Sequence, residues 1–404
     1  MNTYGRFPLA LAKGKGCWVK DTQGRRYLDA VAGIATCTLG HSDRAMQRAL
    51  RKQLGRLQHV SNLYRIPEQE ELASWLVRNS CADSVFFCNS GAEANEAAIK
   101  LARKHGHQRR GIEQPVILTA AASFHGRTLA AVTATGQPKY HKGFEPMVTG
   151  FDYFPYNDLK ALEALINRYE QAGPSIAAVL ADPLQGEGGV NPGDRAFFSR
   201  LREICTERNI LLIFDEVITG LGRMGAYTGA EEFGVTPDIL TLAKQITNGA
   251  QPLGAVVSKQ EIYDTYMNQG GPDYMVEFPH GYTYSAHPVA CAAGLAALDV
   301  LEREQLPQRV KAMSGYFEQA VHQLKGAPYV EDIRNYGFAA GISLQHHPGE
   351  PLRRPFELGL KCFEKGFYVR WGGDTVQLAP AFVVTEEQID SLINAVGEAL
   401  HEFP

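Results

Sequence analysis

The stretch 239-ILTLAKQITNGAQPLGAVVS-258 contains two apolar runs, ILTLA and LGAVV, separated by a polar loop. Each run has the length and composition of a buried strand. Lys244 stands at the end of the first run, where burying an ammonium group is costly. The position indicates either a side chain whose head reaches water or an amine held there for chemistry.

Four similar apolar runs occur earlier in the chain, and stretches with helical spacing separate several of them. The helical stretches include 93-EANEAAIKLARKH-105 and 197-FFSRLREICTERN-209. Buried strands that alternate with amphipathic helices predict an α/β fold, with a mainly parallel sheet and helices on both of its faces. The four runs are SVFF at 84–87, PVILTA at 115–120, IAAVLA at 176–181 and ILLIF at 210–214.

The two ends of the chain differ from this alternating middle. The first 40 residues are extended and glycine-rich, and the region after about residue 290 contains long helices and several short strands. At 404 residues, the chain is long enough for two domains that share a core. We therefore expect a large domain over residues 41–290 and a smaller α+β domain formed by residues 1–40 together with 291–404.

Composition and charge exclude several classes of function. A net charge of −4 indicates no basic surface for nucleic acid, and no run approaches the ~20 apolar residues of a membrane span. The seven cysteines are scattered without a C-x-x-C pair, so we expect no metal site, no disulfide framework and a cytoplasmic location. Two histidine pairs, 105 with 107 and 346 with 347, lack further metal ligands nearby and are interpreted as surface residues.

The segment 89-NSGAEANEAAIK-100 has small residues where a helix is expected to begin. Gly91 and Ala92 would let a phosphate approach the backbone N–H groups at the positive end of that helix, and Ser90 could add a hydroxyl. An ordinary helix start, capped by Asn89 or Ser90, explains the same residues equally well.

Further polar residues follow other strands, and the carboxyl ends of parallel strands meet in one crevice. Asp215 ends the run ILLIF, where a carboxylate is either a structural ion-pair partner or the partner of a protonated ring nitrogen. Together with Lys244, the aromatic Phe124 and the small-residue segment, Asp215 favours the second interpretation. A phosphate anchor, a surface for stacking, a ring-nitrogen partner and an amine are what pyridoxal phosphate (PLP) requires.

The segment 220-GLGRMG-225 matches the G-x-G-x-x-G pattern of dinucleotide-binding proteins, which leaves a nicotinamide oxidoreductase as an alternative. That pattern should open a helix directly after a strand. No apolar helical pattern begins at these glycines, so we interpret the segment as a flexible loop.

These motifs resemble those of the class III (ornithine-type) aminotransferases, PLP-dependent enzymes of fold type I, over nearly the whole chain. The motifs include FFCNSGAEANEAAIKLAR, SFHGRTLA, ILLIFDEVITG, AKQITNGA and YTYSAHP. The resemblance implies that the large domain binds PLP and that two subunits form a homodimer with shared active sites; further pairing into a tetramer is left open. The implied partners are small molecules, an amino donor and a keto acid acceptor.

Matching motif by motif, the resemblance implies that Lys244 forms a Schiff base with the cofactor and that Asp215 binds its ring nitrogen; both are expected to be catalytic. Phe124 and Val217 are expected on the two ring faces, and Thr283 at the phosphate of the neighbouring subunit. The full cofactor-binding set is Ser90, Gly91, Ala92, Phe124, His125, Asp215, Val217, Lys244 and Thr283, and the substrate-binding set is Arg127, Arg370 and Glu187.

The resemblance is divided along the chain. Residues 1 to about 210 are most similar to acetylornithine aminotransferases and the rest to omega-amino acid:pyruvate (beta-alanine:pyruvate) aminotransferases, so we hypothesise a chimera. Arg127 corresponds to the carboxylate-binding arginine of the first group and Arg370 to that of the second. Gln377 stands where the first group has another arginine, so the partner of Glu187 is open among Arg127, Arg370 and water.

Two further residues depart from the acetylornithine pattern. Ile218 stands where a glutamine is expected to contact the cofactor, and Asp182 replaces a glutamate, which shortens the side chain by one methylene. The roles of Asp182 and Glu187 are left open.

The second part of the chain carries Lys244, Thr283 and Arg370, which decides the first choice of function. That choice is a ping-pong transaminase that moves an amino group from an omega-amino acid or amine, such as beta-alanine, to a keto acid such as pyruvate. The alternative, which Arg127 and Phe124 favour, is N-acetylornithine:2-oxoglutarate transamination. An aminomutase or decarboxylase of the same family is also compatible with these residues.

Overall fold

The computed structural model of the protein describes residues 1, 3–171, 173, 175–267, 272, 274 and 278–403. Its largest sheet has seven strands, and all six predicted apolar runs belong to it. Five neighbouring strands run parallel, and β12 pairs antiparallel with both of its neighbours. In sheet order the strands are β4 (Ser84–Cys88), β12 (Gly254–Ser258), β11 (Ile239–Leu242), β10 (Leu211–Asp215), β7 (Ile176–Ala181), β5 (Val116–Ala120) and β6 (Phe151–Phe154).

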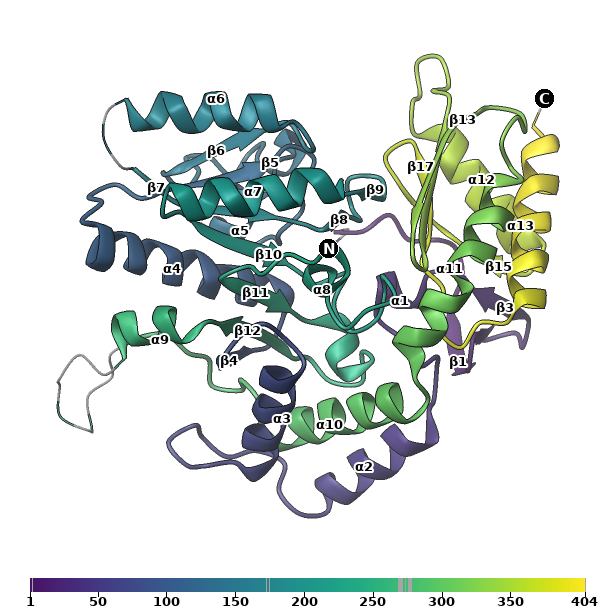
Figure 1. The fold of residues 1–404 in the computed structure, drawn as a ribbon. Helices are drawn as coiled ribbons and strands as arrows, with labels where there is room; N and C mark the ends of the chain where they lie inside the picture. Colours follow the sequence, from purple (N-terminus) through teal and green to yellow (C-terminus); the bar gives the residue numbers. More distant parts are fainter. Residues whose placement is uncertain are drawn as a thin grey trace.

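Helices cover both faces of this sheet, as the alternating pattern predicts (Figure 1). The helix α4 (Gly91–Arg110) lies across one face, where it meets Ile117, Ile213 and Ile239 in one apolar cluster. Their neighbours Leu118, Leu212 and Leu240 point to the other face, because side chains alternate along a strand. That second face is covered by α6 (Leu159–Glu170) and α7 (Arg195–Glu207).

The N-terminal strands and the C-terminal region of the chain lie together at one side of the molecule (Figure 1). Near the N-terminus, β1 (Leu11–Lys15), β2 (Trp18–Asp21) and β3 (Arg26–Asp29) form a sheet, and β15 (Phe367–Tyr368) joins it parallel to β3. This pairing agrees with a small domain built from both ends; the boundaries at residues 40 and 290 stay a prediction. A further sheet has the order β13 (Val330–Tyr336), β14 (Ala339–Leu344), β17 (Thr375–Leu378) and β16 (Arg370–Gly372).

The remaining elements pack around these sheets. Helix α10 contacts α2 and α3, while α11 and α12 pack against the C-terminal sheet and α13 packs against both of these helices. Their bounds are α1 (Ala32–Ala35), α2 (Arg44–Leu54), α3 (Pro67–Arg78), α5 (Leu129–Ala134), η1 (Pro138–Tyr140), β8 (Leu184–Gln185), β9 (Asn191–Pro192), α8 (Gly229–Phe233), η2 (Lys244–Thr247), α9 (Gln260–Tyr266), α10 (Pro288–Arg303), α11 (Leu306–His322), α12 (Arg353–Glu364) and α13 (Glu386–His401).

Two expectations from the sequence are wrong. The segment 220–225 is buried rather than an exposed flexible loop, and its Arg223 is fully enclosed, with Nη1 donating to the carbonyls of Phe338 (2.9 Å) and Pro380 (2.6 Å). His105 is buried as well, because it lies on a helix that packs against the sheet. None of the helices among the described residues has the length and apolar character needed to cross a membrane.

Candidate active site

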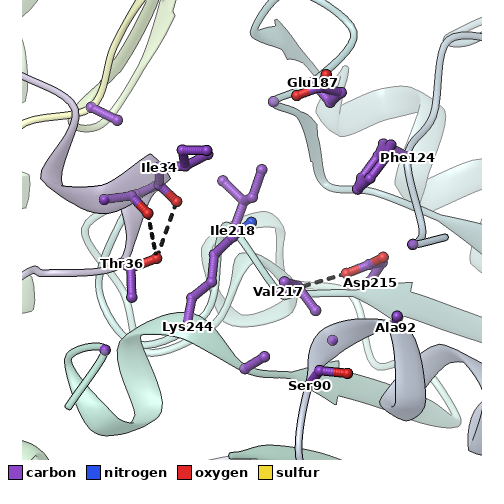
Figure 2. Close-up of a pocket in the computed structure, with 18 of the residues that line it drawn as sticks. Ile34, Thr36, Ser90, Ala92, Phe124, Glu187, Asp215, Val217, Ile218 and Lys244 are labelled. Atoms are coloured by element: carbon purple, nitrogen blue, oxygen red, sulfur yellow. Dashed lines mark hydrogen bonds between the residues drawn. The ribbon is translucent and has the colours of Figure 1, made fainter. Parts of the chain in front are cut away.

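A cavity of about 630 Å³ lies where the parallel strands end. Figure 2 shows Phe124, Asp215 and Val217 on one side of it, Ile34 and Thr36 on the other, and Lys244 between them. Eleven of the twelve residues that the sequence predicts for the site line this cavity, and Thr283 does not. The eleven are Ser90, Gly91, Ala92, Phe124, His125, Arg127, Glu187, Asp215, Val217, Lys244 and Arg370.

Asp215 is held at the back of the cavity by three donated hydrogen bonds. Asn95 Nδ2 and His125 Nδ1 each lie 2.8 Å from its Oδ2, and the Val217 backbone N–H donates to Oδ1 at 3.0 Å. Thr241 in turn donates to Asn95 Oδ1 at 3.0 Å, which fixes the amide orientation. Burial acts to raise the pKa of Asp215, but the bonds from His125, Val217 and Asn95 lower it overall, so the carboxylate is ionised at neutral pH.

His125 lies between two buried carboxylates. Its side chain is completely buried, its Nδ1 meets Asp215, and its Nε2 lies 3.8 Å from Asp182 Oδ2. Burial acts to lower the pKa of His125, but the charges of Asp182 and Asp215 raise it overall. Burial also raises the pKa of Asp182 to about 7, although the charge of His125 opposes this.

Lys244 begins the short helix η2 directly after β11 and adopts a left-handed backbone conformation with φ of 44°. Burial lowers the pKa of its amine to about 8, although the charge of Asp215 opposes this shift. Within the described part of the chain, the Lys244 amine has no ion-pair partner. A lysine with this pKa has an accessible neutral form near pH 8, which is the nucleophilic and basic form.

Helix α4 points its N-terminus into the cavity. Ser90 is its N-cap, and the Ser90 Oγ accepts a hydrogen bond from the Glu93 backbone N–H at 3.2 Å. Gly91 has no room for a side chain, since a Cβ there would lie 2.9 Å from both γ-methyl groups of Val217. The two interpretations of this segment are therefore compatible: Ser90 caps the helix, and free N–H groups face the cavity beside Val217.

Arg127 is exposed at the mouth of the cavity among aromatic rings. Its guanidinium carbon lies 5.4 Å from the ring centre of Tyr4, 5.5 Å from that of Tyr140 and 5.9 Å from that of Phe124. Among the residues that the structure describes, Arg127 forms no ion pair with a carboxylate. Its charge is therefore available to an anionic ligand.

Arg370, in contrast, is already paired. Its Nη2 donates to Glu187 Oε2 at 2.5 Å, and its Nη1 donates to Gln377 Oε1. The Tyr140 hydroxyl donates to the other oxygen of Glu187 at 2.8 Å. Burial acts to raise the pKa of Glu187, but Arg370 and Tyr140 lower it overall. Of the three possible partners of Glu187, the structure therefore shows Arg370, from β16, and Gln377 takes the adjacent place on β17.

Sequence reasoning missed one wall of the cavity, formed by residues 31–36. Four consecutive residues there, from Ala32 to Ala35, have positive φ angles between 48° and 66°. This left-handed turn is costly for Ile34, a β-branched residue, and Asp29 stabilises it by accepting the backbone N–H groups of Val31 (2.9 Å) and Ala32 (2.8 Å). The only signal in the sequence is Asp29 followed by a run of small residues.

Thr283 is exposed outside the cavity, on a surface rim formed by residues 57–64 and 282–287. Asn62 joins the two segments by donating to the Ser285 carbonyl at 3.0 Å. Large apolar side chains stand exposed on this rim: Leu63 at 88%, Tyr64 at 67% and Tyr284 at 64% of their full surface. Among the described residues of this chain, Thr283 is therefore the one predicted site residue that lies away from the cavity.

Comparisons with known proteins show which family the sequence of this chain matches. Residues 1–400 match the sequence family described as aminotransferase class-III. An acetylornithine aminotransferase of Parasynechococcus marenigrum is 51% identical, over 100% of this chain and 93% of its own length. A beta-alanine–pyruvate aminotransferase of Pseudomonas aeruginosa is 42% identical, over 98% of this chain and 92% of its own length. Since each relative spans almost the whole chain, a chimeric junction is not needed to explain the likeness to both.

A solved structure shows the same fold. The ornithine aminotransferase of Toxoplasma gondii, which has PLP at partial occupancy in its active site, superposes with a TM-score of 0.90. It is 28% identical, and the match covers 99% of this chain and 91% of that one.

Proposed function

Because the chain belongs to the class III aminotransferases, we propose that it exchanges an amino group between N-acetylornithine and 2-oxoglutarate in a ping-pong reaction. PLP is the cofactor of this family. The Parasynechococcus marenigrum acetylornithine aminotransferase matches at 51% identity and the beta-alanine–pyruvate enzyme at 42%, which favours this substrate pair over the first choice from sequence.

The cavity fits PLP on three observations. The N-terminus of α4, with Ser90 to Ala92, supplies N–H donors for a phosphate, and the missing Cβ at Gly91 leaves the approach open. The ionised carboxylate of Asp215 suits a protonated ring nitrogen. The amine of Lys244, with its pKa lowered to about 8, suits an aldehyde. We assign the ring faces to Phe124 and Val217.

When bound, PLP supplies an aldehyde for the amino group and a ring that withdraws electrons from the neighbouring carbon. Asp215 keeps a proton on the ring nitrogen because its own pKa is held low. Lys244, once released as a neutral amine, removes the proton from the amine-bearing carbon of the donor as general base. In the reverse half of the cycle, the same lysine would deliver a proton to the carbon of the keto acid that gains the amino group.

The choice of substrate rests on the different states of the two arginines. Arg127 has no carboxylate partner within the described chain, whereas Arg370 is neutralised by Glu187. A donor with one α-carboxylate and an uncharged far end suits this arrangement, because only one free cation is needed. 2-Oxoglutarate brings a second carboxylate, which Arg370 can bind once Glu187 moves aside.

If beta-alanine is the amino donor, the same residues must rearrange before the first substrate can bind. Its single carboxylate would bind Arg370, so the pair between Arg370 and Glu187 would have to open for the first substrate. The 42% identity to a beta-alanine–pyruvate aminotransferase keeps this as the second candidate.

Two matched variants distinguish the arginines. Arg127→Ala is expected to raise the KM for N-acetylornithine about 10- to 100-fold, since a charge-assisted hydrogen bond contributes ~1.5–3 kcal/mol. Arg370→Ala is expected to affect the KM for 2-oxoglutarate more than that for N-acetylornithine. Steady-state kinetics with each substrate varied in turn measures both. An unchanged donor KM in Arg127→Ala, with donor binding lost in Arg370→Ala, would reverse the assignment.

We further propose that the protein is a homodimer with shared active sites. The exposed apolar side chains of Leu63, Tyr64 and Tyr284 are suited to burial against a second copy, and Thr283 on the same rim would then approach the partner's phosphate site. Light scattering is expected to give twice the mass of the 44.4 kDa chain. Thr283→Ala is expected to weaken PLP binding several-fold without changing that mass. A monomer with full activity would contradict the proposal.

A cytoplasmic location is also proposed. All seven cysteines are unpaired, and five of them are buried, which suits a reducing compartment.

A further inference from the structure

Two buried polar atoms in the site face each other without a hydrogen bond. His125 Nε2 and Asp182 Oδ2 are both out of contact with solvent and have no hydrogen-bond partner. They lie 3.8 Å apart, beyond the ~3.2 Å limit of a nitrogen–oxygen hydrogen bond. Unpaired polar atoms in a protein interior are destabilising, so a pair of them in the active site calls for an explanation.

The surroundings hold the two atoms in this arrangement. The His125 backbone is fixed by the hydroxyl of Thr135, 2.9 Å from its N–H, and by Asn95 Nδ2, 2.8 Å from its carbonyl. The backbone carbonyl of Asp182 accepts a hydrogen bond from the Tyr156 hydroxyl at 2.7 Å. Neither residue can close the gap by a backbone shift without breaking one of these contacts.

One proton can be shared between His125 Nε2 and Asp182 Oδ2 across this gap. With Nδ1 donating to Asp215, a single proton shared by the other imidazole nitrogen and Asp182 lies either on Nε2, facing a carboxylate, or on Oδ2, facing a bare nitrogen. Both arrangements place one proton between Nε2 and Oδ2. Both also give the trio of His125, Asp182 and Asp215 the same net charge of about −1.

We propose that Asp182 is a positioning residue that acts through His125, by holding one proton in the gap between its Oδ2 and the imidazole Nε2. The Asp182 carboxylate orients the imidazole toward Asp215 and favours the charged form of His125. Asp215 then stays ionised where it meets the ring nitrogen of the cofactor. This role rests on the proposed function of Asp215 and does not depend on which amino donor the enzyme uses.

The other groups near Asp182 support this role. Charged groups reach it from three elements: His125 after β5, Asp215 at the end of β10 and Lys244 at the start of η2. Burial raises the pKa of Asp182 to about 7, so its carboxyl can exchange a proton with the imidazole near neutral pH. The hydroxyl of Tyr156, from the segment after β6, donates to the backbone carbonyls of Asp182 (2.7 Å) and Pro183 (3.2 Å).

The test follows His125 directly in the holoenzyme, by NMR of selectively ¹⁵N-labelled histidine across a pH series. In the Asp182→Asn variant, the midpoint of His125 titration is expected to fall by about one pH unit or more, because the carboxylate that favours its charged form is gone. Asp152→Asn is the matched control, since Asp152 faces Arg168 at 2.5 Å and not His125. An unmoved His125 midpoint in Asp182→Asn would overturn the proposal.

A second variant keeps the test valid should Asp182→Asn not fold. Asp182→Glu lengthens the side chain by at most ~1.5 Å, enough to bring the gap within hydrogen-bond range. The Nε2–H proton signal of His125 is then expected to move downfield and to persist to higher pH. A signal identical to that of the parent protein would show that the two side chains do not interact. Because neither readout needs turnover, a wrong assignment of the substrate leaves this test intact.

Discussion

Replacement of Lys244 by alanine is expected to lower turnover by about 10³-fold or more. The variant loses both the amine that bonds to the cofactor aldehyde and the general base that moves the substrate proton. The fold should persist, because the Lys244 amine makes no ion pair among the described residues. Single-turnover assays and the absorbance of the lysine-bound cofactor measure the two losses separately.

The control for this variant is Lys20→Ala, which removes an exposed lysine on β2 and should leave activity unchanged. Turnover like that of the parent enzyme in purified Lys244→Ala protein would refute the assignment of this lysine.

Replacement of Asp215 by asparagine is expected to lower kcat by about 10²- to 10³-fold while the protein stays folded. Asparagine retains an acceptor for the Val217 N–H but has no negative charge to hold a proton on the ring nitrogen. Circular dichroism and thermal unfolding should show a folded protein, and steady-state kinetics should show the loss in kcat. Asp215→Glu should recover part of it, because the charge is restored.

The sign of the pKa shift adds a pH dependence to this prediction. The folded-state pKa of Asp215 is below its ordinary value, so the stability that its ionised form contributes is present above about pH 4 and is lost as the pH falls further. In the Asp215→Asn variant, the free energy of unfolding should no longer show this loss in acid. If the free energy of unfolding falls equally in both proteins as the solution becomes acidic, the lowered pKa of Asp215 is contradicted.

Sequence patterns predicted the large sheet because its strands are buried on both faces and read as continuous apolar runs. They missed β6, an edge strand of four residues, FDYF, in which Asp152 interrupts the apolar run. The apolar segment 367-FYVR-370 divides between two sheets at Val369: β15 pairs with β3, and β16 pairs with β17. Which sheet a short strand joins depends on distant partners that local sequence does not encode.

The sequence predicted that these residues gather at one place in the fold, but it did not predict how they pair. Lys244 and Asp215 stand at strand ends, where an α/β fold gathers its functional groups. The partner of Glu187 could not be chosen from sequence, since the contact with Arg370 joins residues 183 positions apart. The left-handed turn around Ile34 was also missed, because local preferences oppose it and a tertiary contact with Asp29 stabilises it.

The most direct test of the proposed specificity is a half-reaction. Purified enzyme loaded with PLP is mixed with N-acetylornithine, and separately with beta-alanine, without any keto acid, and the absorbance of the lysine-bound cofactor is followed. We predict rapid loss of that absorbance with N-acetylornithine and at least tenfold slower loss with beta-alanine at equal concentration. Faster conversion by beta-alanine would contradict the account and would place the donor carboxylate at Arg370 instead of Arg127.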